Sequence, residues 1–173
     1  MPGFFANNPL GHNQQMMEPS FEKLLVKLAD AKVRFILVGG LAVTLQGYVR
    51  FTEDVDILVE RTKENIDQLL DCLGDYGEGF ARELTPGDFD DEEGAIRIVE
   101  ETEQCQIDIF TRMSGQTYAD ILVSAEVFVL SGREIHYASK TSLIFWKQSS
   151  VREKDRLDAM ALQKLIMDPY AFD

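Results

Sequence analysis

The sequence predicts a single α+β domain in which helices flank a small mixed β-sheet. Apolar residues recur at helical spacing at several places along the chain. Between these places lie short apolar runs that alternate as strands do. The length of 173 residues is enough for one well-buried domain and too short for two comfortable ones.

The N-terminal stretch, residues 1–19, is expected to be a flexible tail, and residues 20–173 the domain itself. The tail has no basic residue before its short apolar patch and no small-residue cleavage site, so it is not typical of a signal peptide. A helix over 20–31 follows, because apolar side chains recur there at helical spacing: Phe21, Leu24, Leu25 and Leu28.

Short strands and helices alternate in the next part of the chain. The predicted elements are strands over 33–38 and 54–59 and helices over 41–48 and 62–74. Thr62 is expected to cap the second of these helices. Residues 75–94 are rich in Gly, Pro and acidic residues and predict a solvated loop. Their spacing does not match a calcium-binding loop.

The second half of the chain predicts a β-hairpin, a further pair of strands and three helices. The hairpin strands cover 95–100 and 104–110, the later strands 126–130 and 134–138, and the helices 118–124, 139–148 and 151–167. The sheet is therefore assembled early in the chain, and helices close the domain at its end.

Charge and composition limit the classes of function. A net charge of −13 argues against broad, sequence-independent nucleic-acid binding. Acidic residues dominate 53–108 and basic residues 133–164, which suits a site where cations and phosphates meet, although composition alone favours two solvated faces of opposite sign. No segment has the roughly 18 apolar residues of a membrane span. Cys72 and Cys105 show no metal-type spacing, which fits thiols in a reducing cytoplasm.

Two aspartates at the start of a predicted strand are the main candidate site. Asp54 and Asp56 point to the same side of an extended strand, where like charges repel unless a cation lies between them. Mg²⁺ suits such oxygen ligands. Asp108 repeats the arrangement in the second hairpin strand. If the two strands are neighbours, three carboxylates converge, as is needed to hold two metal ions and activate a hydroxyl.

Each of these signals has an ordinary structural explanation when taken alone. Two aspartates separated by one residue are common in strands, and Gly39-Gly40 could serve a tight turn only. Because this glycine pair follows a strand and opens a helix, it could also bring backbone N–H groups to a phosphate. The order of the motifs, joined by Arg50 and Thr52, is more specific than any one of them.

This order resembles the nucleotidyltransferase superfamily with the polymerase-β-like fold. It is most similar to the small bacterial branch that includes abortive-infection toxins and lincosamide-type antibiotic nucleotidyltransferases. The resemblance implies that Gly39 and Gly40 bind NTP phosphates. It also implies that Asp54 and Asp56 bind metal, and that Asp108 completes the metal site and helps to activate the acceptor hydroxyl.

The C-terminal segment LIFWKQSSVREKDRLDAMAL extends the resemblance. It implies that Lys147 and Lys154 contact phosphate and that Asp155 and Asp158 orient them. The alternative is ordinary surface pairs along a helix, Arg152 with Asp155 and Lys154 with Asp158. Two residues outside this segment have similarly open roles: Arg50 and Thr52 either contact phosphate or brace the aspartates by hydrogen bonds.

The sequence therefore predicts a metal-dependent nucleotidyltransferase that moves a nucleoside monophosphate from an NTP to an acceptor hydroxyl and releases pyrophosphate. Two Mg²⁺ ions are expected, with Mn²⁺ as a substitute, in a monomer or homodimer. The acceptor is a small molecule or a macromolecule. The alternative is a non-catalytic or regulatory module with a partner protein, as in toxin–antitoxin pairs. A phosphohydrolase fits less well, because both aspartates lie where their strand begins.

Overall fold

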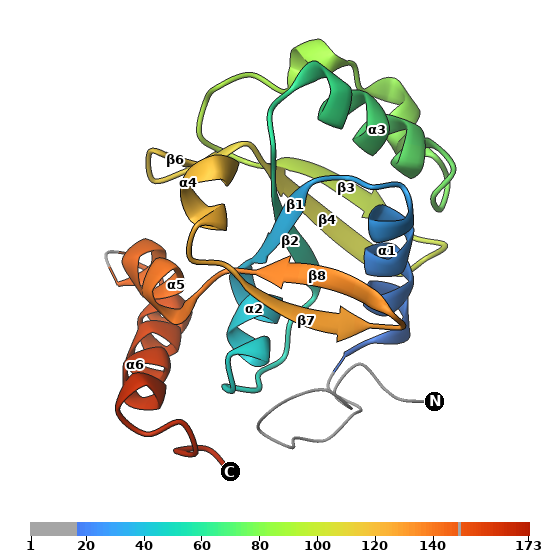
Figure 1. Cartoon of the computed structure of the whole chain (residues 1–173). Coiled ribbons are helices and arrows are strands. Elements are labelled where there is room, and N and C mark those ends of the chain that lie inside the picture. Colours follow the sequence, from blue (N-terminus) through green and yellow to red (C-terminus); the bar gives the residue numbers. More distant parts are fainter. Residues whose placement is uncertain (1–16, 149) are drawn as a thin grey trace.

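A mixed β-sheet of six strands forms the centre of the molecule within the described residues (Figure 1). The structure is a computed structural model that describes residues 17–148 and 150–173. The strands of this sheet are β1 (Phe35–Val38), β2 (Asp54–Val59), β3 (Ile96–Glu100), β4 (Cys105–Phe110), β7 (Glu126–Leu130) and β8 (Arg133–Tyr137). Their spatial order is β3-β4-β2-β1-β8-β7, which confirms the predicted α+β class.

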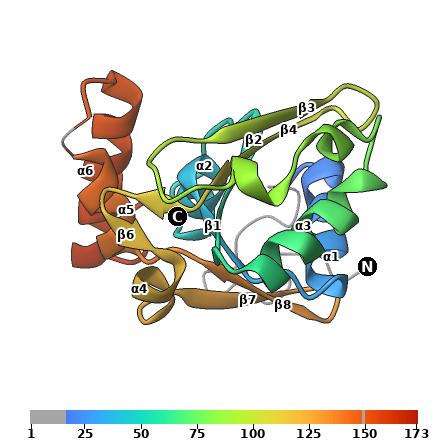
Figure 2. The ribbon, with the colours of Figure 1, turned by 90° about the horizontal axis from the view of Figure 1, so that it is seen from above.

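Helices pack on both sides of the sheet. They are α1 (Pro19–Asp30), α2 (Gly39–Leu45), α3 (Lys63–Gly74), α4 (Tyr118–Leu122), α5 (Lys140–Lys147) and α6 (Glu153–Met167). Helices α5 and α6 lie together at the left of Figure 2, away from α1 and α3 at the right. Thr62 caps α3 by accepting a hydrogen bond from the backbone N–H of Asn65, as the sequence predicts.

The strand register explains the position of the aspartates. All four residues of β1 are buried, which makes it a central strand covered on both faces. Strand β2 pairs antiparallel with β1 and parallel with β4. In β2 the buried Val55 and Ile57 alternate with the half-buried Asp54 and Asp56. One face of β2 therefore contributes to the hydrophobic core, and the start of the other presents carboxylates.

The loop over 75–94 is more ordered than the sequence predicts. It contains two short 3-10 helices, η2 (Phe80–Glu83) and η3 (Pro86–Asp88). Ala81 and Phe89 are buried in the core, so apolar contacts hold the loop in place despite its acidic composition. A second, two-stranded sheet of β5 (Arg112–Met113) and β6 (Gln116–Thr117) was not predicted, because strands of two residues leave no periodic pattern.

Some element boundaries differ from the predictions. Helix α2 already begins at Gly39 and ends at Leu45, and α6 begins at Glu153 instead of residue 151. The predicted tail falls mostly on residues 1–16, which lie outside the described residues, so it stays a prediction. Met17 is buried in the core. Within the described part of the chain, no helix has the length and apolar character needed to cross a membrane.

Candidate functional site

Three carboxylates meet where β2 and β4 lie side by side. The parallel register places Asp56 directly opposite Asp108, so both side chains lie on the same face of the sheet. Asp54 lies two residues earlier on that face. One carboxylate oxygen from each residue lies within 4.8 Å of the other two. The predicted convergence is therefore present, and we call Asp54, Asp56 and Asp108 the acidic triad.

The acidic triad places negative charges where water is scarce. Burial first, and then the charges of Asp54 and Asp108, raise the pKa of Asp56 from 3.8 to about 7. The pKa of Asp54 is raised as well, first by burial and then by the charge of Asp108. Oδ1 of Asp56 is buried and accepts no hydrogen bond from a described residue. Such a group is stabilised by a cation.

Arg97 on β3 neutralises the third carboxylate. Its guanidinium donates from Nε to Asp108 Oδ1 at 2.9 Å and from an Nη nitrogen to Oδ2 at 3.1 Å. The sequence predicts that Asp108 faces outward, but its side chain is only 7% exposed because Arg97 lies across it. The sequence did not lead us to predict Arg97 as a site residue, although the antiparallel register of the predicted hairpin places it opposite Asp108.

The two glycines let neighbouring side chains approach the backbone. Gly39 has a φ of +69°, and an added Cβ would overlap the carboxylate of Asp56. At Gly40 an added Cβ would lie 2.8 Å from Arg50 Nη2 and 2.9 Å from Thr52 Oγ1. The turn therefore packs against Asp56, Arg50 and Thr52, all of which the sequence singles out.

Arg50 and Thr52 do not donate to the carboxylates of the acidic triad. Thr52 Oγ1 donates to the backbone carbonyl of Asp54 at 3.3 Å, so it supports the start of β2. Arg50 Nε instead lies 2.9 Å from Asp158 Oδ1 on α6. The expectation that Arg50 braces the aspartates directly is thus not met. Arg50 ties the loop before β2 to the C-terminal helices.

Lys147 also pairs with Asp158, and both side chains are buried. Its Nζ lies 3.0 Å from Asp158 Oδ2 and 3.1 Å from Asp155 Oδ1. Asp158 is 1% exposed, so it is no surface partner of Lys154. Of the two surface pairs considered from the sequence, the structure contains only Arg152 with Asp155, at 3.7 Å. The positive charge of Lys147 offsets part of the rise in the pKa of Asp56.

Two further side chains act on Asp54. The charge of the exposed Lys154 at the start of α6 offsets part of the rise in the pKa of Asp54. Gln106 on β4 donates from Nε2 to Asp54 Oδ2 at 3.3 Å. The sequence indicates Lys154 but not Gln106, because an amide in a strand carries no specific signal. Basic groups therefore approach the acidic triad from β3, α5 and α6.

The residues of this site fit a divalent metal ion. Carboxylate oxygens are the ligands that Mg²⁺ and Mn²⁺ prefer, and three of them converge here. The buried Oδ1 of Asp56, without a partner among the described residues, offers a coordination position. Both oxygens of Asp108 accept hydrogen bonds from Arg97. Asp108 can therefore bind metal only after Arg97 moves away or gives up one of these bonds.

No protein-family model and no curated protein matches the chain. Among solved structures, the lincosamide antibiotic adenylyltransferase LnuA, with lincomycin bound, aligns with a TM-score of 0.61 and 20% identity, over 86% of this chain and 98% of its own. A Thermotoga maritima protein, provisionally described as a nucleotidyltransferase, aligns with a TM-score of 0.53 and 17% identity, over 91% of this chain and 99% of its own.

An antigenic nucleotidyltransferase-like protein from Paracoccidioides brasiliensis aligns with a TM-score of 0.50 and 17% identity, over 83% of this chain and 73% of its own. These proteins share little sequence with the chain but the same arrangement of elements. The nucleotidyltransferase fold that the resemblance predicts is therefore confirmed.

Proposed function

We propose that this chain, whose fold is that of the nucleotidyltransferases, moves a nucleoside monophosphate from an NTP to a hydroxyl group of an acceptor. The acceptor oxygen forms a bond to the α-phosphorus, the bond from the α-phosphorus to the bridging oxygen breaks, and pyrophosphate leaves. The observation that carries this proposal is the acidic triad, with its ligand atoms within 4.8 Å of one another.

The acidic triad is the proposed holder of one or two Mg²⁺ ions, with Mn²⁺ as a substitute. Bound metal would neutralise charge that develops on the transferring phosphoryl group. Asp108 is assigned the proton of the acceptor hydroxyl because it belongs to the same cluster, and Arg97 has to release one of its oxygens before it can accept that proton. Arg97 holds Asp108 in one orientation and reduces its repulsion with Asp56.

The basic groups around the acidic triad are the proposed phosphate contacts. The charges of Lys147 and Lys154 offset part of the rise in the pKa of Asp56 and Asp54, and we assign both lysines to the phosphates of an NTP. Lys147 is held in place by Asp155 and Asp158, which fits the orienting role that the resemblance implies.

The glycine turn and the loop before β2 complete the proposed nucleotide site. Gly39 lies against Asp56, and Gly40 lies against Arg50 and Thr52, so the glycine turn stands next to the metal ligands and we assign its backbone to the NTP phosphates. Thr52 supports the backbone of Asp54, and Arg50 connects this loop to α6. We assign both residues a bracing role within the nucleotide site.

The acceptor is proposed to be a small molecule. The net charge of −13 disfavours a polyanionic acceptor, and LnuA, with its similar fold, was solved with the antibiotic lincomycin bound. The reaction is placed in the cytoplasm, where the buried free thiols of Cys72 and Cys105 remain reduced.

The experiment combines transfer and binding measurements. The full chain is incubated with labelled NTPs, Mg²⁺ and a panel of hydroxylated acceptors, and NTP binding is followed by calorimetry. We expect Asp54→Asn and Asp108→Asn each to lower transfer by roughly a hundredfold or more. Asp168→Asn, an exposed change at the end of α6, is the matched control and should leave transfer unchanged. Full transfer in either triad variant would refute the proposal.

A regulatory module with a partner protein is the second candidate function. It is favoured by exposed apolar side chains on α6, where Leu157 is 49%, Met160 65% and Met167 87% exposed. The two functions are separated by calorimetry together with co-purification. Absence of Mg²⁺ and NTP binding, with a stoichiometric partner retained on the purified chain, would favour the module and exclude turnover.

A further inference from the structure

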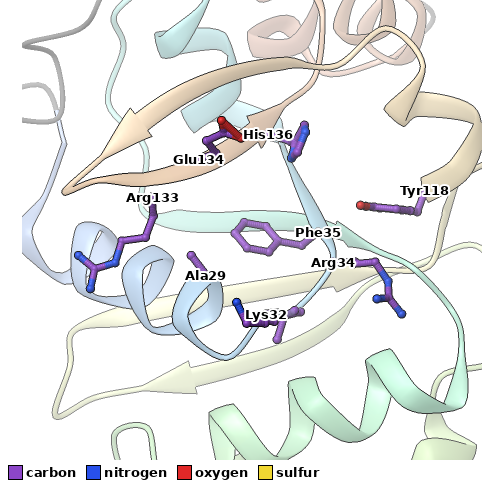
Figure 3. Close-up of a pocket in the computed structure, with 9 residues that line it drawn as sticks. Ala29, Lys32, Arg34, Phe35, Tyr118, Arg133, Glu134 and His136 are labelled. Atoms are coloured by element: carbon purple, nitrogen blue, oxygen red, sulfur yellow. The ribbon is translucent and has the colours of Figure 1, made fainter.

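A cavity of about 300 Å³ lies at the opposite end of β1 from the Gly39–Gly40 turn. The register of β1 with β8 consists of one pair, Leu37 with Tyr137, and the two strands diverge from there toward their starts (Figure 3). The space between them is bounded by the end of α1, the start of β1, α4 and β8. We call it the β1–β8 cavity, and none of its lining residues belongs to the acidic triad.

Basic side chains gather in this cavity although the chain as a whole is strongly acidic. The charged and titratable groups that line it are Lys32, Arg34, Arg133, His136, Tyr118 and Glu134. The two arginines each form a salt bridge with a carboxylate that does not line the cavity. Arg133 Nε lies 2.8 Å from Asp30 Oδ1, and Arg34 Nε lies 2.6 Å from Glu60 Oε1.

Three polar groups in the cavity remain without a protein partner. The side chains of the exposed Lys32 and the half-buried His136 form no salt bridge or hydrogen bond with any residue that the structure describes. The same is true of the hydroxyl of Tyr118, although this side chain is only 7% exposed. Figure 3 shows the Tyr118 oxygen pointing into the cavity, with His136 and Lys32 on two other sides. The Tyr118 hydroxyl therefore keeps its donor and acceptor capacity for a ligand in the cavity.

The backbone conformation at Lys32 is an independent indication that a positive charge is needed at the cavity. Lys32 has a φ of +59° at the C-terminal end of α1, where its N–H bonds to the carbonyl of Ala29 and the next N–H bonds to that of Leu28. Glycine is the usual residue in this left-handed position, because a side chain is strained there. A lysine at this position places a cation at the cavity at the expense of backbone strain.

We propose that the β1–β8 cavity binds a small phosphorylated molecule, with the phosphate group between Lys32, His136 and Tyr118. The three donors come from the α1–β1 turn, β8 and α4, and so surround the ligand from three sides. Donors on three sides can each bond to a different oxygen of a phosphate group. The ring of Phe35 lies between them and offers an apolar surface to the rest of the ligand.

Inorganic phosphate is the probe for this site. It is titrated into the full chain by calorimetry and in thermal unfolding, with EDTA present so that no metal ion draws phosphate to the acidic triad. We expect saturable binding and a rise in the melting temperature. Lys32→Gly and Tyr118→Phe should each weaken binding about tenfold. Because glycine suits the left-handed backbone, Lys32→Gly should unfold at the same or a higher temperature than the native chain without phosphate.

Lys27→Ala is the matched control, because it removes one positive charge from the same helix but lies outside the cavity lining. It should bind phosphate as the native chain does. Succinate is titrated in the same way, to test whether the cavity binds a carboxylate instead of a phosphate. Binding of phosphate that is insensitive to Lys32→Gly, absence of phosphate binding by the native chain, or binding of succinate without phosphate would each overturn the proposal.

Discussion

Asp56 is held against its electrostatic preference, because burial and two neighbouring carboxylates raise its pKa to about 7. The native protein then retains a proton that the unfolded chain releases above its ordinary pKa of 3.8. Without metal, the free energy of unfolding therefore falls as the pH rises from about 4 to about 7. Asp56→Asn removes this dependence and should stabilise the metal-free protein at pH 8 by roughly 1–3 kcal/mol.

Urea unfolding at pH 4 and pH 8, with EDTA or with Mg²⁺, measures this effect. The difference between native chain and variant should be small at pH 4, where Asp56 is protonated in the folded chain and about half of it is still protonated in the unfolded chain. Mg²⁺ should stabilise the native chain at pH 8 and leave Asp56→Asn nearly unaffected. An equal gain from Mg²⁺ in both proteins would show that Asp56 does not hold the ion.

Arg97 competes with metal for Asp108. Its two hydrogen bonds occupy both oxygens of that carboxylate, and the charges of Asp54 and Asp56 also raise the pKa of its guanidinium. We expect Arg97→Gln to tighten Mg²⁺ binding about threefold to tenfold, because a competing cation is removed. Calorimetric titration with MgCl₂ measures the change.

Arg82→Gln is the matched control for Arg97. The side chain of Arg82 is 64% exposed and that of Arg97 59%, and Arg82 lies near Asp75, away from the acidic triad. Its loss should leave the Mg²⁺ affinity unchanged. Weaker Mg²⁺ binding by Arg97→Gln would indicate that Arg97 organises Asp108 for metal and does not compete with it.

At the scale of elements, the turn between β1 and α2 sets the position of Asp56. Gly39→Ala combines a positive φ with an overlap between the new Cβ and the Asp56 carboxylate. The backbone strain alone should cost about 1–2 kcal/mol. Because the overlap also displaces Asp56, we expect Mg²⁺ binding to weaken at least about tenfold.

Gly132→Ala separates these two effects. Gly132 also has a positive φ, +81°, but an added Cβ would meet nothing within 4 Å. It should lose a similar amount of stability and keep its Mg²⁺ affinity, as measured by urea unfolding and calorimetry. If both variants bind Mg²⁺ equally well, the glycine turn does not control the metal site.

At the scale of the whole molecule, Asp158 connects the C-terminal helices to the sheet. It is 1% exposed and lies within 3.0 Å of cationic nitrogens of both Arg50 and Lys147. Asp158→Asn leaves two charges without their buried partner and should cost about 3 kcal/mol of stability. It should also weaken NTP binding, because Lys147 is no longer oriented.

Urea unfolding and NTP calorimetry test this connection, with Asp155→Asn as the comparison. Asp155 pairs with Lys147 but not with Arg50, and it is less deeply buried. We expect a smaller loss of stability for Asp155→Asn than for Asp158→Asn. Equal, small losses would mean that the pairs contribute only as surface salt bridges do.

The sequence alone predicted most of the fold because helices and strands are specified locally. The apolar spacing of α1, the Thr62 cap of α3 and the alternation in β2 and β4 each depend on residues a few positions apart. The two-residue strands β5 and β6 and the 3-10 helices of the acidic loop carry too few residues for such a signal. Their positions depend on packing against the core.

The candidate site was predicted in part for the same reason. Asp54 and Asp56 share a face in any extended strand, and the hairpin register that pairs Arg97 with Asp108 could have been read from the predicted turn. By contrast, no local pattern shows that Asp158 on α6 meets Arg50 in the loop before β2. That ion pair exists only once both segments pack against the sheet.

The sequence by itself determined the longer helices and strands, the glycine turn and the same-face placement of two carboxylates, since these follow from local patterns and backbone geometry. Only the tertiary structure decided that β2 and β4 are parallel neighbours with Asp56 opposite Asp108. It also decided that Arg97 covers Asp108 and that β1 and β8 diverge around a basic cavity. These features join segments distant in the chain, and burial of the shared core, not local propensity, brings such segments together.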